Sequence, residues 1–319
     1  ELYKDLPILV IDSWDKINKN FLEKEYIRIQ QHKKKQLYNY DTLTLEYWID
    51  IIKSSQVNQS KLDITTLIDQ DIHFITYGSG PFENARNRII KEAESFGEFK
   101  TITGYGPSDL PKDFMNTYES IMKEKRGGGY WIWRPIILIS ALNEIKENDF
   151  LIYLDAGCTL NKQGKQRFYE YLKLLNDSEY GMLSFQMSGQ TGPGTLEIEK
   201  KWTIKETFEY LNIDINSNIA NSGQYLGGIL VMKKNKHLMD YMNIYKNSIL
   251  NKTDLCTDIY NNNGKQIPEF IENRHEQSIT SILRKKHGSV VIDGDESWMP
   301  PFGIEQSLKY PFWATRKRS

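Results

Sequence analysis

From residue 72 onward, short apolar runs alternate with stretches in which apolar residues recur at helical spacing. The apolar runs predict strands over residues 73–76, 99–102, 150–154, 181–185, 227–232 and 289–292. The helical spacing predicts helices over residues 82–96, 111–125, 135–145 and 277–285. Strands that alternate with helices are typical of a mostly parallel sheet covered on both faces. The pattern therefore predicts an α/β domain over residues 68–319.

Residues 1–67 have a different pattern. An apolar run over 6–11 predicts one short strand, and the stretch over 17–53, rich in Lys, Gln, Tyr and Leu, has helical spacing. Residues 54–60 are polar and unpatterned, which is typical of a linker. We therefore expect a small N-terminal segment of one strand and a few helices ahead of the α/β domain.

Composition narrows the function classes. The 319 residues carry a formal net charge of -1, so the chain lacks the basic field that draws proteins to nucleic acid. Cys158 and Cys256 are the only cysteines, and their spacing supports neither a disulfide framework nor a zinc cluster. The sequence has no run of about 18 apolar residues and no signal-peptide pattern. We expect no membrane insertion of this chain and a cytoplasmic location, and its first residue, Glu1, fits a processed or excised form.

The clearest buried strand pattern is followed directly by polar and small residues, Asp155 to Cys158. In parallel sheets, ligands bind outside the carboxyl ends of the strands. A carboxylate placed there can hold a divalent cation that bridges a diphosphate, and Gly157 lets a ligand approach the backbone. The alternative is that Asp155 only caps the following turn, and this motif alone does not decide between the two.

Residues 126–135 form a second candidate cluster, with three glycines, two tryptophans and Arg134 before Pro135. The proline suits the first turn of a helix, and an arginine beside it can bind phosphates through a forked contact. The alternative is a buried aromatic anchor for the helix, and both can hold.

Two further clusters carry weaker signals. Residues 221–228 are small and polar and lead into a strand, which lets a ligand pass but is also typical of a β-bulge. Residues 272–277 offer a cation, an imidazole and a carboxylate within one helical turn. Such a set can supply a base or an acceptor contact, although it also fits a solvated helix cap.

Taken in order, these clusters resemble the nucleotide-diphospho-sugar transferase (GT-A) superfamily, and more closely a group of largely uncharacterised glycosyltransferases of bacteria and giant viruses. The matching segments are residues 128–135 (GGYWIWRP), 153–158 (YLDAGC), 274–278 (RHEQS) and 310–316 (YPFWATR). The resemblance spans about residues 72–316. It implies a GT-A (Rossmann-like) fold and the activity of a hexosyltransferase. The donor would be a nucleotide sugar, with UDP favoured because the superfamily uses it most, and the acceptor a hydroxyl of a glycan or glycoprotein.

The resemblance also implies roles for particular residues. Asp155 takes the place of the first aspartate in the Asp-x-Asp signature, and Glu276 is the candidate on the acceptor side, where it would act as a base if the enzyme inverts. The residues expected near the donor are Thr76, Tyr77, Gly78, Arg88, Arg134, Ala156 and Gly157. Those expected near the sugar or the acceptor are Trp131, Gln186, Asn221, Gly223, Gln224 and Gln277.

The sequence departs from the family pattern at the second aspartate, which is Gly157. The resemblance implies a divalent cation, Mn²⁺ or Mg²⁺, bound by Asp155. One carboxylate plus phosphate oxygens is a thin ligand set for such an ion, unless His275 or a nearby acid completes it.

Other interpretations stay open. Residues 151–160 also fit a haloacid-dehalogenase-like phosphatase, with Thr159 in the fitting place and Asp293 and Asp295 as late acids, although the general acid expected at Gly157 is absent. A non-catalytic sugar-nucleotide-binding module is the third hypothesis. Residues 1–53 weakly resemble the closing segment of exostosin-like glycosyltransferases, which would imply a second transferase module upstream.

Overall fold

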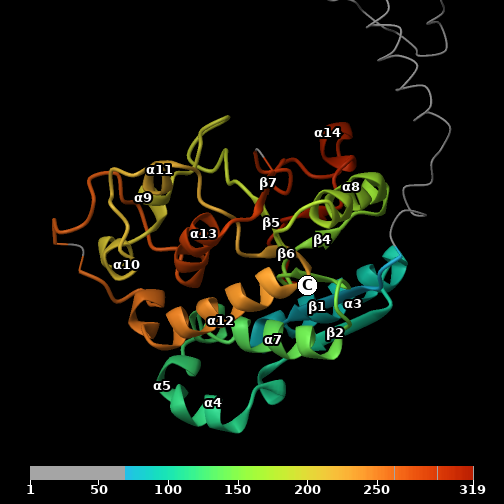
Figure 1. Ribbon diagram of the computed structural model, residues 1–319, viewed down its shortest axis with the longest axis horizontal. Coiled ribbons are helices and arrows are strands. Elements are labelled where there is room, and N and C mark those ends of the chain that lie inside the picture. Colours follow the sequence, from blue (N-terminus) through green and yellow to red (C-terminus); the bar gives the residue numbers. More distant parts are fainter. Residues whose placement is uncertain (1–68, 262, 293, 319) are drawn as a thin grey trace, which may run out of the picture. The chain divides into compact units, whose positions relative to one another are not determined.

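The computed structural model describes residues 69–318 except 262 and 293. The segment predicted for residues 1–67 and its exostosin-like resemblance lie outside the described residues. The described chain folds around one six-stranded sheet with helices on both sides (Figure 1).

The central sheet has the strand order β2-β1-β3-β6-β5-β7. Its strands are β1 (Ile72–Tyr77), β2 (Thr101–Tyr105), β3 (Phe150–Leu154), β5 (Met182–Phe185), β6 (Ile229–Lys233) and β7 (Val290–Ile292). β6 runs antiparallel to β3 and β5, and the other neighbouring pairs are parallel. The predicted fold class, an α/β domain with a mostly parallel sheet flanked by helices, is confirmed.

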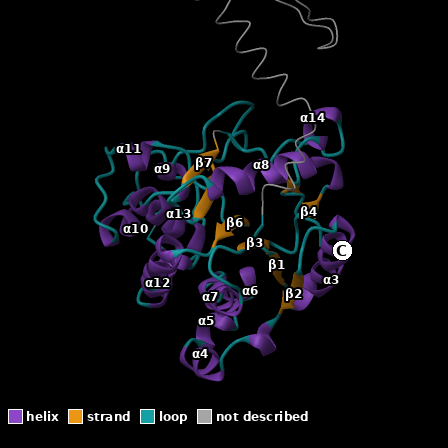
Figure 2. Cartoon of the chain, turned by 45° about the vertical axis from the view of Figure 1, so that its right-hand side comes forward, coloured by secondary structure: helices purple, strands orange, loops and turns teal. Residues whose placement is uncertain are grey.

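Side chains alternate across β3 and divide the core into two layers, as expected of a strand buried on both faces. Leu151 and Tyr153 pack with the helices α7 (Arg134–Glu144), α12 (Lys236–Leu250) and α13 (Glu276–His287). Phe150, Ile152 and Leu154 pack with α3 (Glu83–Phe96) and α8 (Lys165–Asn176) on the opposite face (Figure 2).

A second, two-stranded sheet joins the end of the described chain to the segment after β3. β4 (Thr159–Leu160) pairs antiparallel with β8 (Phe312–Trp313). The remaining short elements are η3 (Gly80–Phe82), η4 (Pro107–Asp109), α4 (Lys112–Thr117), α5 (Glu119–Met122), α6 (Gly127–Tyr130), η5 (Lys162–Gly164), α9 (Glu199–Trp202), α10 (Lys205–Tyr210), α11 (Asn218–Asn221), η6 (Thr253–Cys256) and α14 (Glu305–Leu308).

Most of the predicted elements occur, with shifts that have local causes. The helix predicted over 111–125 is divided into α4 and α5, because Tyr118 leaves helical geometry at φ -109° and ψ 23°. The strand predicted over 99–102 begins two residues later, at Thr101. Helix α3 ends as predicted, because Gly97 adopts the left-handed conformation at φ 79° that glycine tolerates best.

Candidate functional site

A cleft of about 1000 Å³ opens at the carboxyl ends of β1 and β3. Loops that are distant in the sequence line it, namely residues 77–82, 122–134, 155–158, 226–229, 274–277 and 314–318. Ligand pockets commonly measure about 300–1000 Å³. The cleft lies at the upper end of this range, so its size suits a ligand larger than a single sugar. The predicted location at the strand ends therefore coincides with a large cleft.

Asp155 lies in this cleft, directly after β3, with 35% of its side chain exposed. Its Oδ1 accepts hydrogen bonds from Arg134 Nη2, at 3.0 Å, and from the Tyr153 hydroxyl. A Cβ atom at Gly228 would lie 2.6 Å from Asp155 Oδ2, so glycine there leaves room for the carboxylate. The side-chain carboxylate of Asp155 thus accepts hydrogen bonds from Arg134 and Tyr153. In the alternative interpretation, it would accept them from the backbone of the next turn.

Behind Asp155 lies a buried ion pair between Arg134 and Glu276, each with 3% of its side chain exposed. Arg134 Nη1 donates to Glu276 Oε2, and the Tyr245 hydroxyl donates to Glu276 Oε1. Burial raises the pKa of Glu276, while the charge of Arg134 opposes that rise. One guanidinium thus links Glu276 at the start of α13 to Asp155 at the end of β3.

Aromatic rings surround Arg134. Its guanidinium carbon lies 5.3 Å from the ring centre of Tyr153 and 5.7 Å from that of Trp133. Trp133 is buried, stacks on Tyr77 with ring centres 3.6 Å apart, and donates from Nε1 to the Gly127 carbonyl at 2.8 Å. The predicted aromatic anchor is therefore present, and it holds Arg134 toward Asp155 rather than toward open solvent.

The glycine-rich loop before α7 turns sharply at the cleft wall. Gly127, Gly128 and Gly129 have φ values of 60°, 57° and 97°, and Tyr130 and Trp131 also have positive φ. A Cβ atom at Gly128 would lie 2.6 Å from Ser79 Oγ. This loop needs glycine for both its conformation and its contact with the loop after β1.

His275, the possible additional metal ligand, lines the cleft and pairs with Asp258. Its Nε2 lies 2.9 Å from Asp258 Oδ1, and its ring stacks on Tyr130 with ring centres 5.4 Å apart. Burial lowers the pKa of this imidazole, although the hydrogen bond to Asp258 opposes the shift. Its backbone is strained at φ 59° and ψ -131°. The contacts described for His275 are thus with Asp258 and the aromatic wall, not with Asp155.

The predicted residues of the acceptor side fall into two groups. Trp131 and Gln277 line the cleft. Gln277 accepts from the Gly227 amide at 2.8 Å and donates to Gln224 Oε1 at 2.7 Å. The residues that do not line the cleft are Gln186, Asn221, Gly223 and Gln224.

Those four residues have structural contacts. Gln224 is fully buried and donates to Glu199 Oε2 at 3.0 Å, which supports Gln277 from behind. Gly223 packs on Gln186, because a Cβ atom there would lie 2.4 Å from Gln186 Cγ. Asn221 ends α11 and donates to the Ser217 carbonyl at 2.8 Å.

On the donor side, Tyr77, Gly78, Arg134, Ala156 and Gly157 line the cleft. Thr76 does not, because its buried hydroxyl donates to the Leu154 carbonyl at 2.7 Å and so ties β1 to β3.

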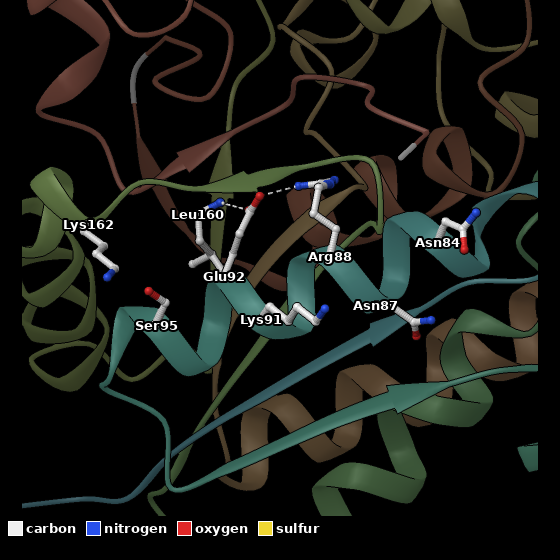
Figure 3. A pocket seen from close by; sticks show the side chains of 8 residues that line it. All are labelled: Asn84, Asn87, Arg88, Lys91, Glu92, Ser95, Leu160 and Lys162. Atoms are coloured by element: carbon white, nitrogen blue, oxygen red, sulfur yellow. Dashed lines mark hydrogen bonds and ion pairs between the residues drawn. The ribbon is translucent and has the colours of Figure 1, made fainter.

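Arg88 lies on the other side of the turn that carries Asp155. Its Nη2 donates to the carbonyls of Ala156, at 2.8 Å, and Cys158, at 2.9 Å. It pairs with Glu92, whose other oxygen accepts from the Leu160 amide at 3.0 Å (Figure 3). Arg88 lines a separate groove along α3 and supports the turn from behind instead of reaching the cleft.

Asp71, His73 and Asp149 form the one group of three possible metal ligands found among the described residues, with ligand atoms within 4.8 Å of one another. They can hold a cation, but they lie at the amino ends of β1 and β3, away from the cleft. Asp149 already accepts from the amides of Asp71 and Lys146, and Asp71 pairs with Lys100. A cation bound here would compete with these contacts.

Several residues that line the cleft, or that hydrogen-bond to residues lining it, were not among the predicted site residues. Tyr245 comes from α12, a helix that the pattern did not single out, and Asp258 lies in a loop without any motif. Arg316 lines the cleft from the tail segment whose letters carried part of the family resemblance, so that segment held an unused signal. Among residues 69–318, except 262 and 293, no helix is long and apolar enough to span a bilayer.

No protein family matches the chain by sequence, and no curated protein does either. The solved structures that are similar in fold include three glycosyltransferases. A glycosyltransferase involved in the glycosylation of the major capsid of PBCV-1 is 12% identical, with 76% of this chain and 93% of that chain covered and a TM-score of 0.43. Mouse xyloside xylosyltransferase 1 in its apo form is 9% identical, with 72% and 86% covered and a TM-score of 0.40. Galactosyltransferase LgtC in complex with donor and acceptor sugar analogues is 10% identical, with 71% and 74% covered and a TM-score of 0.35. All three TM-scores lie below 0.5.

Proposed function

We propose that this protein is a glycosyltransferase that moves a sugar from a nucleoside-diphosphate donor, preferably a UDP-sugar, to a hydroxyl of a glycan or glycoprotein. The observation that carries the proposal is the partly exposed carboxylate of Asp155, held at the carboxyl end of β3 in a cleft of about 1000 Å³. Ligand sites of open α/β sheets lie at this edge. The resemblance to a bacterial and viral group of transferases supports the proposal at the level of motifs.

In this proposal the donor lies along Tyr77, Gly78, Ala156 and Gly157, which line the cleft together. Asp155 contacts the donor through Oδ2, the oxygen that Arg134 and Tyr153 leave free in the described hydrogen bonds. Trp131 can cover the apolar face of a sugar ring, since flat aromatic side chains bury such faces well.

We propose for Glu276 a different place in the mechanism from the one that the family resemblance implies. Both of its carboxylate oxygens accept hydrogen bonds, from Arg134 and Tyr245, and 3% of its side chain is exposed. A general base needs an oxygen within hydrogen-bond reach of the hydroxyl that it deprotonates. We propose that Glu276 fixes Arg134, which in turn orients Asp155, and its role as a base stays a prediction.

A divalent ion of the Asp-x-Asp type does not fit the residues at this site. Mg²⁺ and Mn²⁺ prefer several oxygen ligands. Asp155 offers one free oxygen, Glu276 offers none, and the second signature position is Gly157. The predicted Mn²⁺ or Mg²⁺ is therefore not part of the mechanism that we propose.

The phosphatase hypothesis has less support. Thr159 Oγ1 is buried and lies 2.9 Å from Thr315 Oγ1 instead of facing the cleft. Position 157 carries no side chain that can act as a general acid. The non-catalytic binding module predicts donor binding without turnover, so kinetics separate it from a transferase.

A thermal-shift panel of nucleotide sugars tests the proposal. A ligand that binds only the folded chain stabilises it by about 2.7 kcal/mol at one hundred times its dissociation constant. We expect at least one nucleoside-diphosphate sugar to raise the melting temperature, and the same compound to release its nucleotide when a saccharide acceptor is added. A panel in which small phosphoesters are hydrolysed and no nucleotide sugar binds would reject the proposal.

A further inference from the structure

The place of the missing second carboxylate is covered by the end of the described chain. A Cβ atom on Gly157 would lie 3.3 Å from Arg316 Cα and 3.3 Å from the Lys317 carbonyl oxygen. The Gly157 carbonyl accepts hydrogen bonds from the Lys317 amide and from Thr315 Oγ1, both at 2.9 Å. The tail is thus docked on the same turn that presents Asp155.

The tail is held firmly enough to position a side chain. β8 pairs with β4, and Phe312 is buried among the residues of α8. The Ala314 amide donates to the Ser297 carbonyl at 2.9 Å. Arg316 itself adopts φ 56°, and its guanidinium carbon lies 4.9 Å from the ring centre of Trp298. Trp298 also lines the cleft, so the stacked arginine lies along the cleft wall.

Positive charge exceeds negative charge in the cleft. Its lining includes six lysines and arginines, which are Lys125, Arg126, Arg134, Arg274, Arg316 and Arg318. The lining acids are four, namely Glu124, Asp155, Glu276 and Asp295. Arg134 is buried, and its two terminal nitrogens pair with Asp155 and Glu276, so it is not the cation that meets an incoming diphosphate.

Arg274 is the second cation with a defined position. Its guanidinium carbon lies 4.0 Å from the ring centre of Trp202, and Nη2 donates to Gln190 Oε1 at 3.1 Å. Nε pairs with Glu272 Oε1 at 3.1 Å, but the side chain is 21% exposed, whereas that of Arg134 is 3% exposed. It comes from the loop before α13, whereas Arg316 comes from the tail. Two stacked arginines on separate segments of the lining suit a diphosphate, because a planar guanidinium binds phosphate oxygens in a forked manner.

We propose that Arg316 and Arg274 neutralise the donor diphosphate in place of a divalent ion, so that donor binding and transfer are metal-independent. This inference rests on the proposed function. During transfer, the bond between the anomeric carbon and the diphosphate oxygen breaks, and its electron pair goes to that oxygen. The acceptor oxygen bonds to the same carbon, and the hydroxyl proton passes to solvent. The two arginines stabilise the added negative charge on the leaving nucleoside diphosphate.

Isothermal titration of the full chain with UDP and GDP, in EDTA and again in MnCl₂, tests the inference. We expect one of these nucleotides to bind with dissociation constants that agree within about twofold in the two buffers. Arg316→Ala should raise the dissociation constant about 10- to 100-fold, since a charge-assisted hydrogen bond contributes about 1.5–3 kcal/mol. Arg316→Lys should give an intermediate value, because it keeps the charge but loses the fork.

Lys236→Ala is the matched control, because it removes one positive charge from a side chain that is 85% exposed on α12. Binding that requires Mn²⁺, or an Arg316→Ala variant that binds like the control, would overturn the inference and leave the proposed function standing. Binding of neither nucleotide in either buffer would reject the inference together with UDP as the donor nucleotide.

Discussion

Glu276 decides between two accounts of the cleft, because a base and a structural anchor respond differently to the same substitution. Its carboxylate accepts from Arg134 and Tyr245 and is almost fully buried. Removing one member of a buried ion pair costs about 3–5 kcal/mol. For a domain of this size, each kcal/mol shifts the melting temperature by about 2–4 °C. We therefore expect Glu276→Ala to lower the melting temperature by about 6–20 °C.

Glu276→Gln gives the sharper comparison. The amide keeps one acceptor oxygen and turns an NH₂ group toward the second donor. We therefore expect the free energy of unfolding to fall by about 2 kcal/mol and the melting temperature by about 4–8 °C. Donor affinity should fall together with stability, because Arg134 loses its anchor. The assay is thermal unfolding followed by circular dichroism, with UDP titration of the same samples. Glu209→Gln is the control, since that side chain is 60% exposed and pairs only with Lys205 in the described contacts.

The outcome that would refute this reasoning is specific. A Glu276→Gln variant that melts within about 1 °C of the wild type, binds the donor normally and no longer transfers sugar would establish the predicted base. The carboxylate would then have to leave Arg134 and Tyr245 when the acceptor binds.

Three further substitutions probe the surroundings of the site. Gly228→Ala places a methyl group 2.6 Å from Asp155 Oδ2. We therefore expect initial rates of transfer to fall about tenfold or more, while the melting temperature changes by only a few degrees. An unchanged rate would contradict the position of that oxygen. Burial raises the pKa of Asp295 to about 6, so the folded state holds this proton more tightly than the unfolded state does, and its contribution to stability falls by about 3 kcal/mol as the pH rises from about 4 to 6. The free energy of unfolding, measured in urea between pH 4 and 7, should show that loss in the wild type but not in Asp295→Asn. The same pH dependence in both proteins would contradict the raised pKa of Asp295. Arg88→Ala should lower the free energy of unfolding by about 2–4 kcal/mol, because the turn loses its two carbonyl contacts. Lys91→Ala, in the same groove, should leave the free energy of unfolding unchanged in the same assay.

The order of strands and helices in the described region followed from the sequence to a large extent, because apolar periodicity reports local burial. β3 and α3 occur within one residue of their predicted ends, since a fully buried run and a glycine stop are strong local signals. The reversed direction of β6 was not visible, because periodicity carries no information on strand direction.

The site was predictable in place but less so in detail. Asp155 and Arg134 both line the cleft at the strand ends, although their mutual hydrogen bond was not predicted, whereas Arg88 holds the backbone of the turn from outside the cleft. Arg88 lies within α3, where the sequence does not show whether a side chain points toward the cleft or away from it. Packing decides that direction. The docking of Arg316 on Gly157 depends on a pairing between β4 and β8 that joins segments about 150 residues apart, which no local pattern reveals.

The proposed function depends most on the Asp155 carboxylate in the cleft, and the most direct measurement is the rate of UDP release from a UDP-sugar with and without a saccharide acceptor. The wild type should release UDP mainly when the acceptor is present. Asp155→Asn, which keeps the shape of the side chain, should be slower by about 100-fold while melting within a few degrees of the wild type. An Asp155→Asn variant that transfers sugar at the wild-type rate would contradict the account.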